Sequence, residues 1–171
     1  EDPDAAGVVQ ERMTKGGVKL VFDAAITAVE RRGSDKLIRY TVGTAAYEVT
    51  VDEILVGVGR APNVEGLNLD NAGVAYDRTG VTVNSRLQTS NRRIYAAGDI
   101  CFPYKFTHTA DALAQIVIQN ALFPHPLGLG RASTDSLIVP WCTYTEPEIA
   151  HVGMYEAEAQ AKGLEVETFT Q

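Results

Sequence analysis

A short apolar run, Ile54-Leu55-Val56, constrains the fold of this chain more than any other feature. Continuous apolar residues without polar alternation are typical of a strand that is buried on both faces, as in a parallel sheet covered by helices. The run is broken at Gly57, and the chain then turns sharply through Gly59–Asn63, so a strand is expected over residues 53–58. This feature predicts an α/β fold.

The residues before this run predict a helix followed by an antiparallel meander. Asp2-Pro3 supplies an N-cap and a first-turn proline, and Gly16-Gly17 ends the helix. From residue 18 to residue 51 the pattern changes to short strands, because Tyr47-Glu48-Val49 alternates with period two. Leu37–Val42 is another such strand, and the meander should have one face exposed to water.

The residues after the run predict further strands and one long helix. Apolar residues at helical spacing indicate a largely buried helix over 107–123, and the prolines and glycines of 124–130 form the clearest linker. The other expected elements are strands over 81–83, 93–97, 137–143, 149–152 and 164–169, and a helix over 155–162.

Composition excludes several classes of function. The formal net charge is -7 and no basic stripe is present, so the chain lacks the charge pattern needed to bind nucleic acid. The apolar runs are shorter than the roughly 18 residues of a membrane span. No signal peptide opens the chain, and Cys101 and Cys142 form no CxxC pair, so two reduced, buried thiols and a cytoplasmic location are expected.

The strongest chemical signal is an apolar strand that ends in Gly98-Asp99 and is followed by a helix. A glycine lets a ligand approach the backbone, and a carboxylate suits the hydroxyl groups of a sugar alcohol. The amides at the start of the helix favour partial negative charge, such as that on a flavin carbonyl. Alternatively, Gly98-Asp99 only turns a strand into a loop, and the local pattern leaves both interpretations open.

Three motifs resemble those of the pyridine nucleotide-disulfide oxidoreductases. Thr89–Asp99 is similar to the second FAD-binding motif of that family, and Gly57–Asn63 to the segment that leaves its nicotinamide-nucleotide domain. Pro140–Gly153 resembles the opening of the dimerisation domain. The motifs occur in the family's order, and the mercuric reductase-like and dihydrolipoamide dehydrogenase-like branch is the most similar, judging by Lys105–Asp111 and Val139–Thr145.

The resemblance implies parts of three domains. Residues 1–62 would be the C-terminal part of the NAD(P)-binding domain, 63–131 the C-terminal part of the FAD-binding domain, and 132–171 the start of an α+β dimerisation domain. The fold would therefore combine remnants of Rossmann-like domains with an antiparallel meander. The parent protein would be a homodimer that binds FAD and NAD(P)H, with no nucleic acid or membrane partner.

The same resemblance assigns roles to particular residues. Asp99 would bind a ribitol hydroxyl of FAD while Gly98 gives clearance, and Gly59 would lie near the nicotinamide nucleotide. Phe106, Thr107 and His108 would lie beside the isoalloxazine ring, with the Thr107 amide directed at its pyrimidine edge. An acid/base role for His108 is disfavoured relative to simple packing or capping. No catalytic or metal-binding residue is therefore expected in this chain.

Several elements of the family are absent from the printed sequence. It contains no GxGxxG turn for a pyrophosphate, no CxxxxC redox pair and no C-terminal His-Pro…Glu element. The expectation is an internal fragment, inactive and without its cofactors, of an enzyme that passes a hydride from NAD(P)H to FAD and then electrons to a disulfide or metal ion. The alternative is a non-catalytic scaffold that binds a nucleotide or another protein.

Overall fold

The computed structural model describes residues 2–171 and divides the chain into two compact units. The first unit extends to Val58 and includes Tyr144–Ile149. The second contains Gly59–Thr143 and Ala150–Gln171. The candidate site residues named above all belong to the second unit.

The first unit begins with helix α1, Pro3–Lys15. The Asp2 carboxylate caps this helix by accepting hydrogen bonds from the amides of Asp4, at 2.9 Å, and Ala5. Gly16 forms the C-cap. The helix predicted from these capping residues is confirmed, because its start and stop signals are local.

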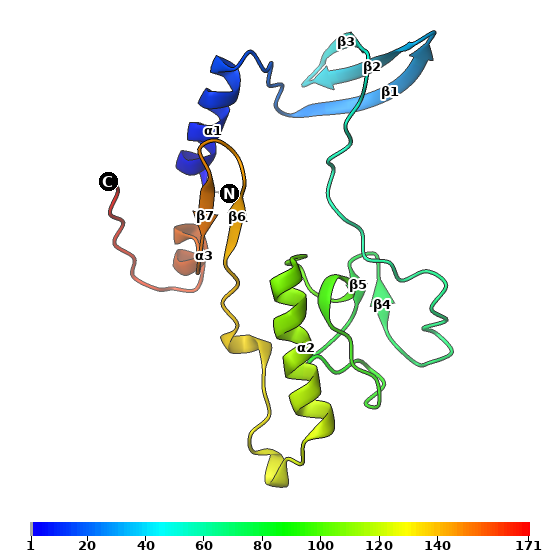
Figure 1. Cartoon of the computed structure of the whole chain (residues 1–171), viewed down its shortest axis with the longest axis vertical. Helices are drawn as coiled ribbons and strands as arrows, with labels where there is room; N and C mark the ends of the chain where they lie inside the picture. The colour runs from blue at the N-terminus through cyan, green and yellow to red at the C-terminus, as the bar shows by residue number, and fades with distance from the viewer. Residues whose placement is uncertain (1) are drawn as a thin grey trace. The chain divides into compact units, whose positions relative to one another are not determined.

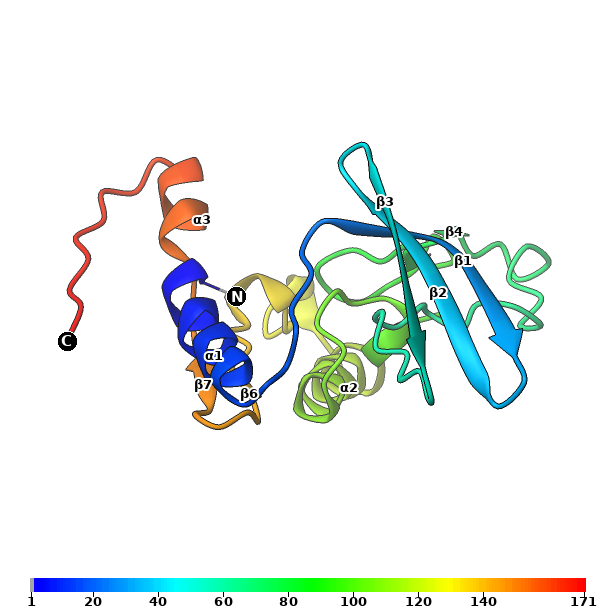
Figure 2. The ribbon, with the colours of Figure 1, turned by 90° about the horizontal axis from the view of Figure 1, so that it is seen from above.

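Strands β1 (Ala24–Arg32), β2 (Asp35–Val42) and β3 (Ala45–Val51) form an antiparallel sheet in the order β1-β2-β3. Figure 1 shows the sheet in blue and cyan, and Figure 2 shows it from above. The rings of Tyr40 and Tyr47, which are directly opposite each other, stack with centroids 5.5 Å apart. The predicted antiparallel meander is therefore confirmed. The expectation that only one face meets water is wrong, because β1 and β3 are exposed along almost their whole length.

Residues 53–58 are not a strand, so that prediction is wrong for this structure. The side chain of Leu55 is 99% exposed, and Val56 and Val58 are also largely exposed. A parallel strand needs neighbours on both edges and helices on both faces. Within residues 2–171 no other strand pairs with this segment, so it is extended but unpaired.

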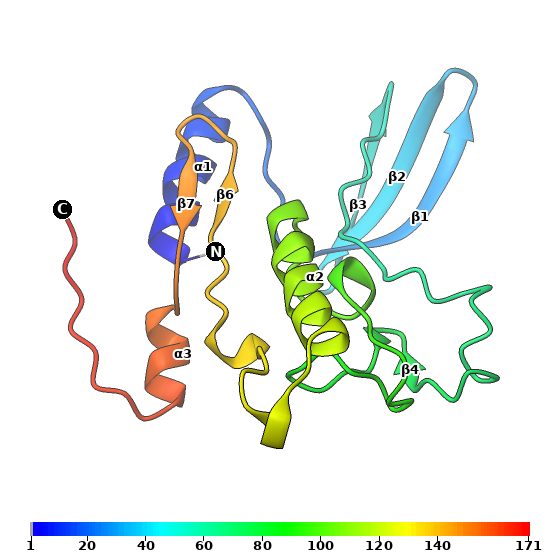
Figure 3. The same cartoon turned by 60° about the horizontal axis from the view of Figure 1, so that its bottom comes forward.

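In the second unit, β4 (Tyr76–Asp77) and β5 (Gly80–Val81) form a hairpin, and the 3-10 turn η1 (Gly98–Ile100) precedes helix α2 (Thr107–Leu122). Figure 3 shows α2 in green beside the turn that contacts it. The strand expected over 93–97 is reduced to a single bridge between Gln88 and Tyr95. The expected strand is therefore much shorter in the structure than the sequence predicted.

Side-chain hydrogen bonds hold the segment before η1 in place. The Ser90 hydroxyl donates to the carbonyl oxygen of Gly73 and accepts from the amide of Ala75, each at 2.8 Å. The Asn91 side-chain amide donates to the carbonyl oxygen of Ala72 at 2.7 Å. These bonds replace the missing strand ladder and fix the approach to Gly98.

Helix α2 has the predicted bounds within one residue, but it is not largely buried. Only Thr109 and Leu113 are buried on it, whereas Ile118 is 50% and Leu122 is 75% exposed. The wide apolar face seen in the sequence therefore lacks a covering layer among the described residues.

The rest of the chain contains short elements. These are η2 (Pro126–Gly128), η3 (Thr134–Ser136), the paired strands β6 (Trp141–Thr143) and β7 (Ile149–His151), and α3 (Glu156–Ala161). The predicted strand over 137–143 is shorter than expected, and residues 164–169 form none. No helix in the described part of the chain is long and apolar enough to span a membrane.

Candidate functional site

The turn at Gly98 brings the end of the 89–99 motif against helix α2. Gly98 has φ +80, a backbone conformation that favours glycine. A Cβ atom at this position would lie 3.2 Å from the Cβ of Ala110. The missing side chain therefore gives clearance to the helix itself, whereas the sequence suggested clearance for a ligand.

A second close approach lies at the last residue of the turn, Ile100. Gly80, the first residue of β5, has φ +127, and a Cβ there would lie 2.2 Å from the carbonyl oxygen of Ile100. Such a contact is incompatible with any side chain. The β4–β5 hairpin therefore contacts the residue that follows Asp99.

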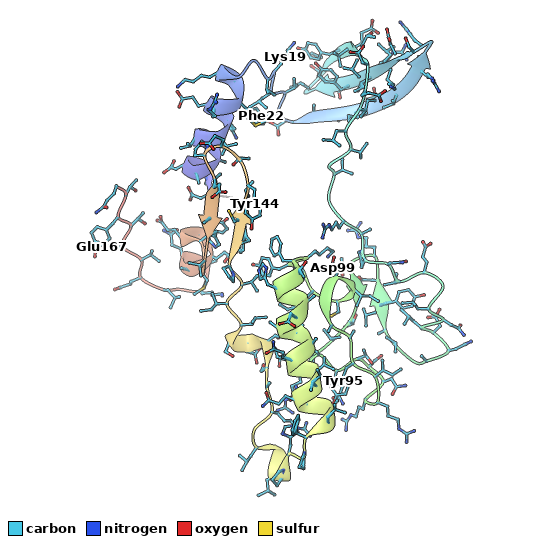
Figure 4. The ribbon with its side chains drawn as sticks, in the orientation of Figure 1. Lys19, Phe22, Tyr95, Asp99, Tyr144 and Glu167 are labelled. Carbon is cyan, nitrogen blue, oxygen red and sulfur yellow. The ribbon has the colours of Figure 1, made fainter. Side chains whose placement is uncertain are left out.

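Asp99 and Arg60, which belong to two different sequence motifs, meet at this turn. The Arg60 guanidinium Nη1 lies 3.6 Å from Asp99 Oδ2 and also donates to the carbonyl oxygen of Lys105 at 3.1 Å. Figure 4 shows Asp99 at the N-terminal end of α2. The Asp99 side chain is 50% exposed, so its carboxylate can still reach a ligand. No pattern in the sequence singled out Arg60 as a site residue.

The first turn of α2 has unsatisfied donors. The N-cap residue Phe106 makes no side-chain hydrogen bond to the helix, and Thr107 and His108 are exposed. The leading amides of a helix have no partner within it. Within residues 2–171, the Thr109 hydroxyl is buried without a hydrogen-bond partner, and such a group is commonly satisfied by a ligand or water.

A group of stacked rings connects this turn with the later part of the unit. Phe106 stacks on His108 with centroids 5.4 Å apart, and it lies 6.3 Å from Trp141. Trp141 contacts His151 at 4.1 Å, and His151 stacks on Tyr155 at 4.0 Å. We call these five residues the aromatic stack. No periodic signal in the sequence indicated it, because its members come from distant segments.

Gly59 directly precedes Arg60, the residue that contacts Asp99. It has φ +97, is exposed, and has no heavy atom within 4 Å of its hypothetical Cβ. All the predicted site residues thus lie around the junction of η1 and α2 or next to a residue that contacts it. Among the described residues, no group of three or more acidic, histidine or cysteine side chains could hold a metal ion.

Cys101 follows this turn as a protonated thiol. Burial raises the pKa of Cys101 to about 11, although the nearby Lys105 ammonium acts in the opposite direction. Its sulfur contacts the carbonyl oxygen of Gly98 at 3.7 Å. Both cysteines are free, as expected, but each is only partly buried, whereas buried thiols were expected.

Comparison with known families assigns most of the chain. Residues 1–116 match the family model described as pyridine nucleotide-disulphide oxidoreductase, and residues 139–171 match the dimerisation domain of the same family. The chain therefore belongs to the pyridine nucleotide-disulphide oxidoreductase family, and the resemblance and the α/β fold class inferred from the sequence are confirmed.

Two curated relatives show the extent of the match. The chain is 39% identical over 168 residues to a mercuric reductase of Staphylococcus aureus, covering 98% of this chain and 30% of that protein. It is 34% identical to a dihydrolipoyl dehydrogenase of Thermus scotoductus, covering 96% of this chain and 35% of the relative. The chain thus spans about a third of the length of these relatives.

Solved structures agree in fold. The HOCl-induced flavoprotein disulfide reductase RclA of Escherichia coli superposes with a TM-score of 0.78 at 28% identity, over 95% of this chain and 36% of that one. LpdA of Mycobacterium tuberculosis gives a TM-score of 0.79 at 30% identity, over 95% of this chain and 34% of that one.

Proposed function

We propose that this chain forms the flavin-facing part of an FAD-dependent NAD(P)H oxidoreductase that reduces a disulfide or a metal ion. The observation that carries this proposal is the half-exposed Asp99 carboxylate at the uncapped N-terminus of α2. An acceptor-only group beside unpaired amide donors suits a ligand that combines sugar hydroxyls with carbonyl oxygens. The ribitol and isoalloxazine of FAD have this combination.

The residues present fit this end of the cofactor. The buried Thr109 hydroxyl lacks a partner within residues 2–171, and the amides of Thr107 and His108 have no side-chain cap. Asp99 would accept a hydrogen bond from a ribitol hydroxyl, and the α2 amides would donate to the pyrimidine edge of the ring. Arg60 would hold the Asp99 carboxylate in position.

When bound, FAD supplies a two-electron carrier that accepts a hydride from NAD(P)H and passes electrons to the acceptor. This chain's own contribution is to bind and orient that carrier. Gly59 would lie near the nicotinamide nucleotide. Residues 1–62 would belong to the NAD(P)-binding domain, 63–131 to the FAD-binding domain, and 132–171 to a dimerisation domain that forms a homodimer.

Replacement of Asp99 tests the proposal directly. In the full protein that carries this chain, Asp99→Ala should weaken FAD binding about tenfold to a hundredfold, since a charge-assisted hydrogen bond contributes roughly 1.5–3 kcal/mol. FAD titration followed by absorbance measures the change. The matched control is Asp77→Ala, which removes an exposed carboxylate bonded to Thr79. Equal FAD affinity in both variants would refute the ribitol role of Asp99.

A further inference from the structure

The imidazole of His108 is bonded to a segment far along the chain. Its Nε2 atom lies 2.7 Å from the carbonyl oxygen of Pro140, the residue immediately before β6. A carbonyl oxygen only accepts, so Nε2 must carry the proton in this contact. The hydrogen bond thereby defines which ring nitrogen is protonated.

The ring of His108 is also held on its face. It stacks on Phe106 with an interplanar angle of 7°, and Phe106 stacks on Trp141 at 17°. Trp141 directly follows Pro140, so both contacts of His108 lead to the same short segment. The ring contacts continue from Trp141 to His151, and from His151 to Tyr155, the N-cap of α3.

His108 lies in the first turn of α2, so its contacts act on the start of this helix. His108 is the second residue of the helix, and the first helical hydrogen bond runs from the Ala110 amide to the Phe106 carbonyl at 2.9 Å. Phe106 gives this helix end no side-chain cap. An uncapped first turn frays readily unless another contact holds it, and the His108–Pro140 bond is such a contact.

The geometry points to His108 as a positioning residue: by donating from Nε2 to the Pro140 carbonyl, it fixes the first turn of α2, with its amides, against the segment Pro140-Trp141. This inference rests on the proposed function, because those amides are the donors assigned there to the flavin. His108 would then act on the flavin through the helix end. The segment that matches the dimerisation domain would thus help to set the flavin environment.

Two substitutions separate the hydrogen bond from the stacking. His108→Gln keeps an N–H donor at nearly the same distance from the backbone but loses the ring. His108→Phe keeps a ring for the stack but loses the donor. The control is His125→Gln, at the opposite end of α2, where the ring nitrogens contact the carbonyl oxygens of Leu129 and Gln119.

The test uses the full protein that carries this chain, with FAD as the probe. His108→Phe should weaken FAD binding about fivefold, the effect of losing one neutral hydrogen bond, and should shift the long-wavelength flavin absorbance band. It should also speed amide hydrogen exchange at Ala110 by a similar factor. His108→Gln should restore all three readouts to wild type, and His125→Gln should leave them unchanged.

Two outcomes would overturn the inference. If His108→Gln and His108→Phe are equally impaired, ring stacking holds the helix end; if both behave as wild type, His108 positions nothing. Nitrogen NMR of the histidine side chains gives a readout that needs no flavin, because the His108 proton must be on Nε2. If wild type fails to bind FAD, the proposed function fails, while the NMR and exchange results still decide the role of His108.

Discussion

The guanidinium of Arg60 lies 3.6 Å from the carboxylate of Asp99 and donates to the carbonyl oxygen of Lys105. One side chain thereby joins the Gly59-Arg60 motif to the turn that begins at Gly98. The two side chains are 69% and 50% exposed. An exposed ion pair contributes only about 0–1 kcal/mol to stability, so this pair orients the carboxylate more than it stabilises the fold.

Arg60→Met should therefore affect ligand binding more than folding. The free energy of unfolding should fall by less than about 1 kcal/mol, whereas FAD affinity of the full protein should fall several-fold because Asp99 is no longer held. Urea denaturation and FAD titration measure the two effects. Arg131→Met, which removes an exposed arginine outside the site, should change neither. A large loss of stability with unchanged FAD binding would contradict the orienting role.

Gly80→Ala should destabilise the second unit because its Cβ would collide with the carbonyl oxygen of Ile100. Gly73→Ala is the matched control, since Gly73 also has a positive φ but has no atom within 4 Å of its hypothetical Cβ. Alanine at Gly73, where φ is +66, should cost about 1–2 kcal/mol. The loss at Gly80 should be larger by at least about 1 kcal/mol, because φ +127 is adopted almost only by glycine and because of the collision. Denaturant unfolding of both variants measures the difference, and equal losses would show that the hairpin does not support η1.

Cys101 should resist alkylation at neutral pH. Because burial raises the pKa of its thiol from 9.0 to about 11, the reactive thiolate is scarce below that pH. The iodoacetamide reaction rate at Cys101, followed by mass spectrometry of the Cys142→Ser variant, should rise steeply only toward pH 11. Rapid modification at pH 7 would contradict the raised pKa of Cys101.

The same pKa shift predicts a loss of stability at high pH. The folded thiol keeps its proton in a range where the unfolded thiol, with an ordinary pKa of 9.0, has lost it. The contribution of the protonated Cys101 thiol to the free energy of unfolding is fully present below pH 9 and is lost as pH rises through about 11. Cys101→Ser should remove this part of the pH dependence. Together with Cys142→Ser, it should leave reductase activity of the full protein within a few-fold.

Residues 1–171 produced alone should be colourless and should not oxidise NAD(P)H. The sequence has no glycine-rich turn for either pyrophosphate and no CxxxxC pair to accept electrons. Visible absorbance after purification and an NAD(P)H consumption assay measure both properties. Flavin near one equivalent, or turnover above buffer, would mean that the sequence contains an unrecognised pyrophosphate site.

Local signals predicted the elements that depend on local physics. The Asp2 cap defined the start of α1, and period-two alternation defined the meander that ends at Val51. The strand expected at 53–58 failed because a parallel strand is specified by neighbours that its own sequence does not contain. Leu55 is an apolar residue of the kind found in protein cores, but its side chain is exposed to solvent.

The sequence indicated which segments form the candidate site. It did not indicate which side chains contact one another there. The Gly98-Asp99 pattern and the helix start at Thr107 were evident from the sequence. The partners of those residues were not, because Arg60 and Pro140 reach them across long stretches of chain. Side-chain contacts of this kind follow from tertiary packing, and no local periodicity records them.

The uncovered segment at Leu55, Val56 and Val58 has a consequence for handling the chain. An extended apolar stretch with unpaired backbone amides and carbonyls is a template for the edge of another strand. At rising concentration, separate copies would pair with one another through these residues. Solubility of this polypeptide should therefore depend on concentration, and a charged substitution such as Val56→Lys should delay its precipitation.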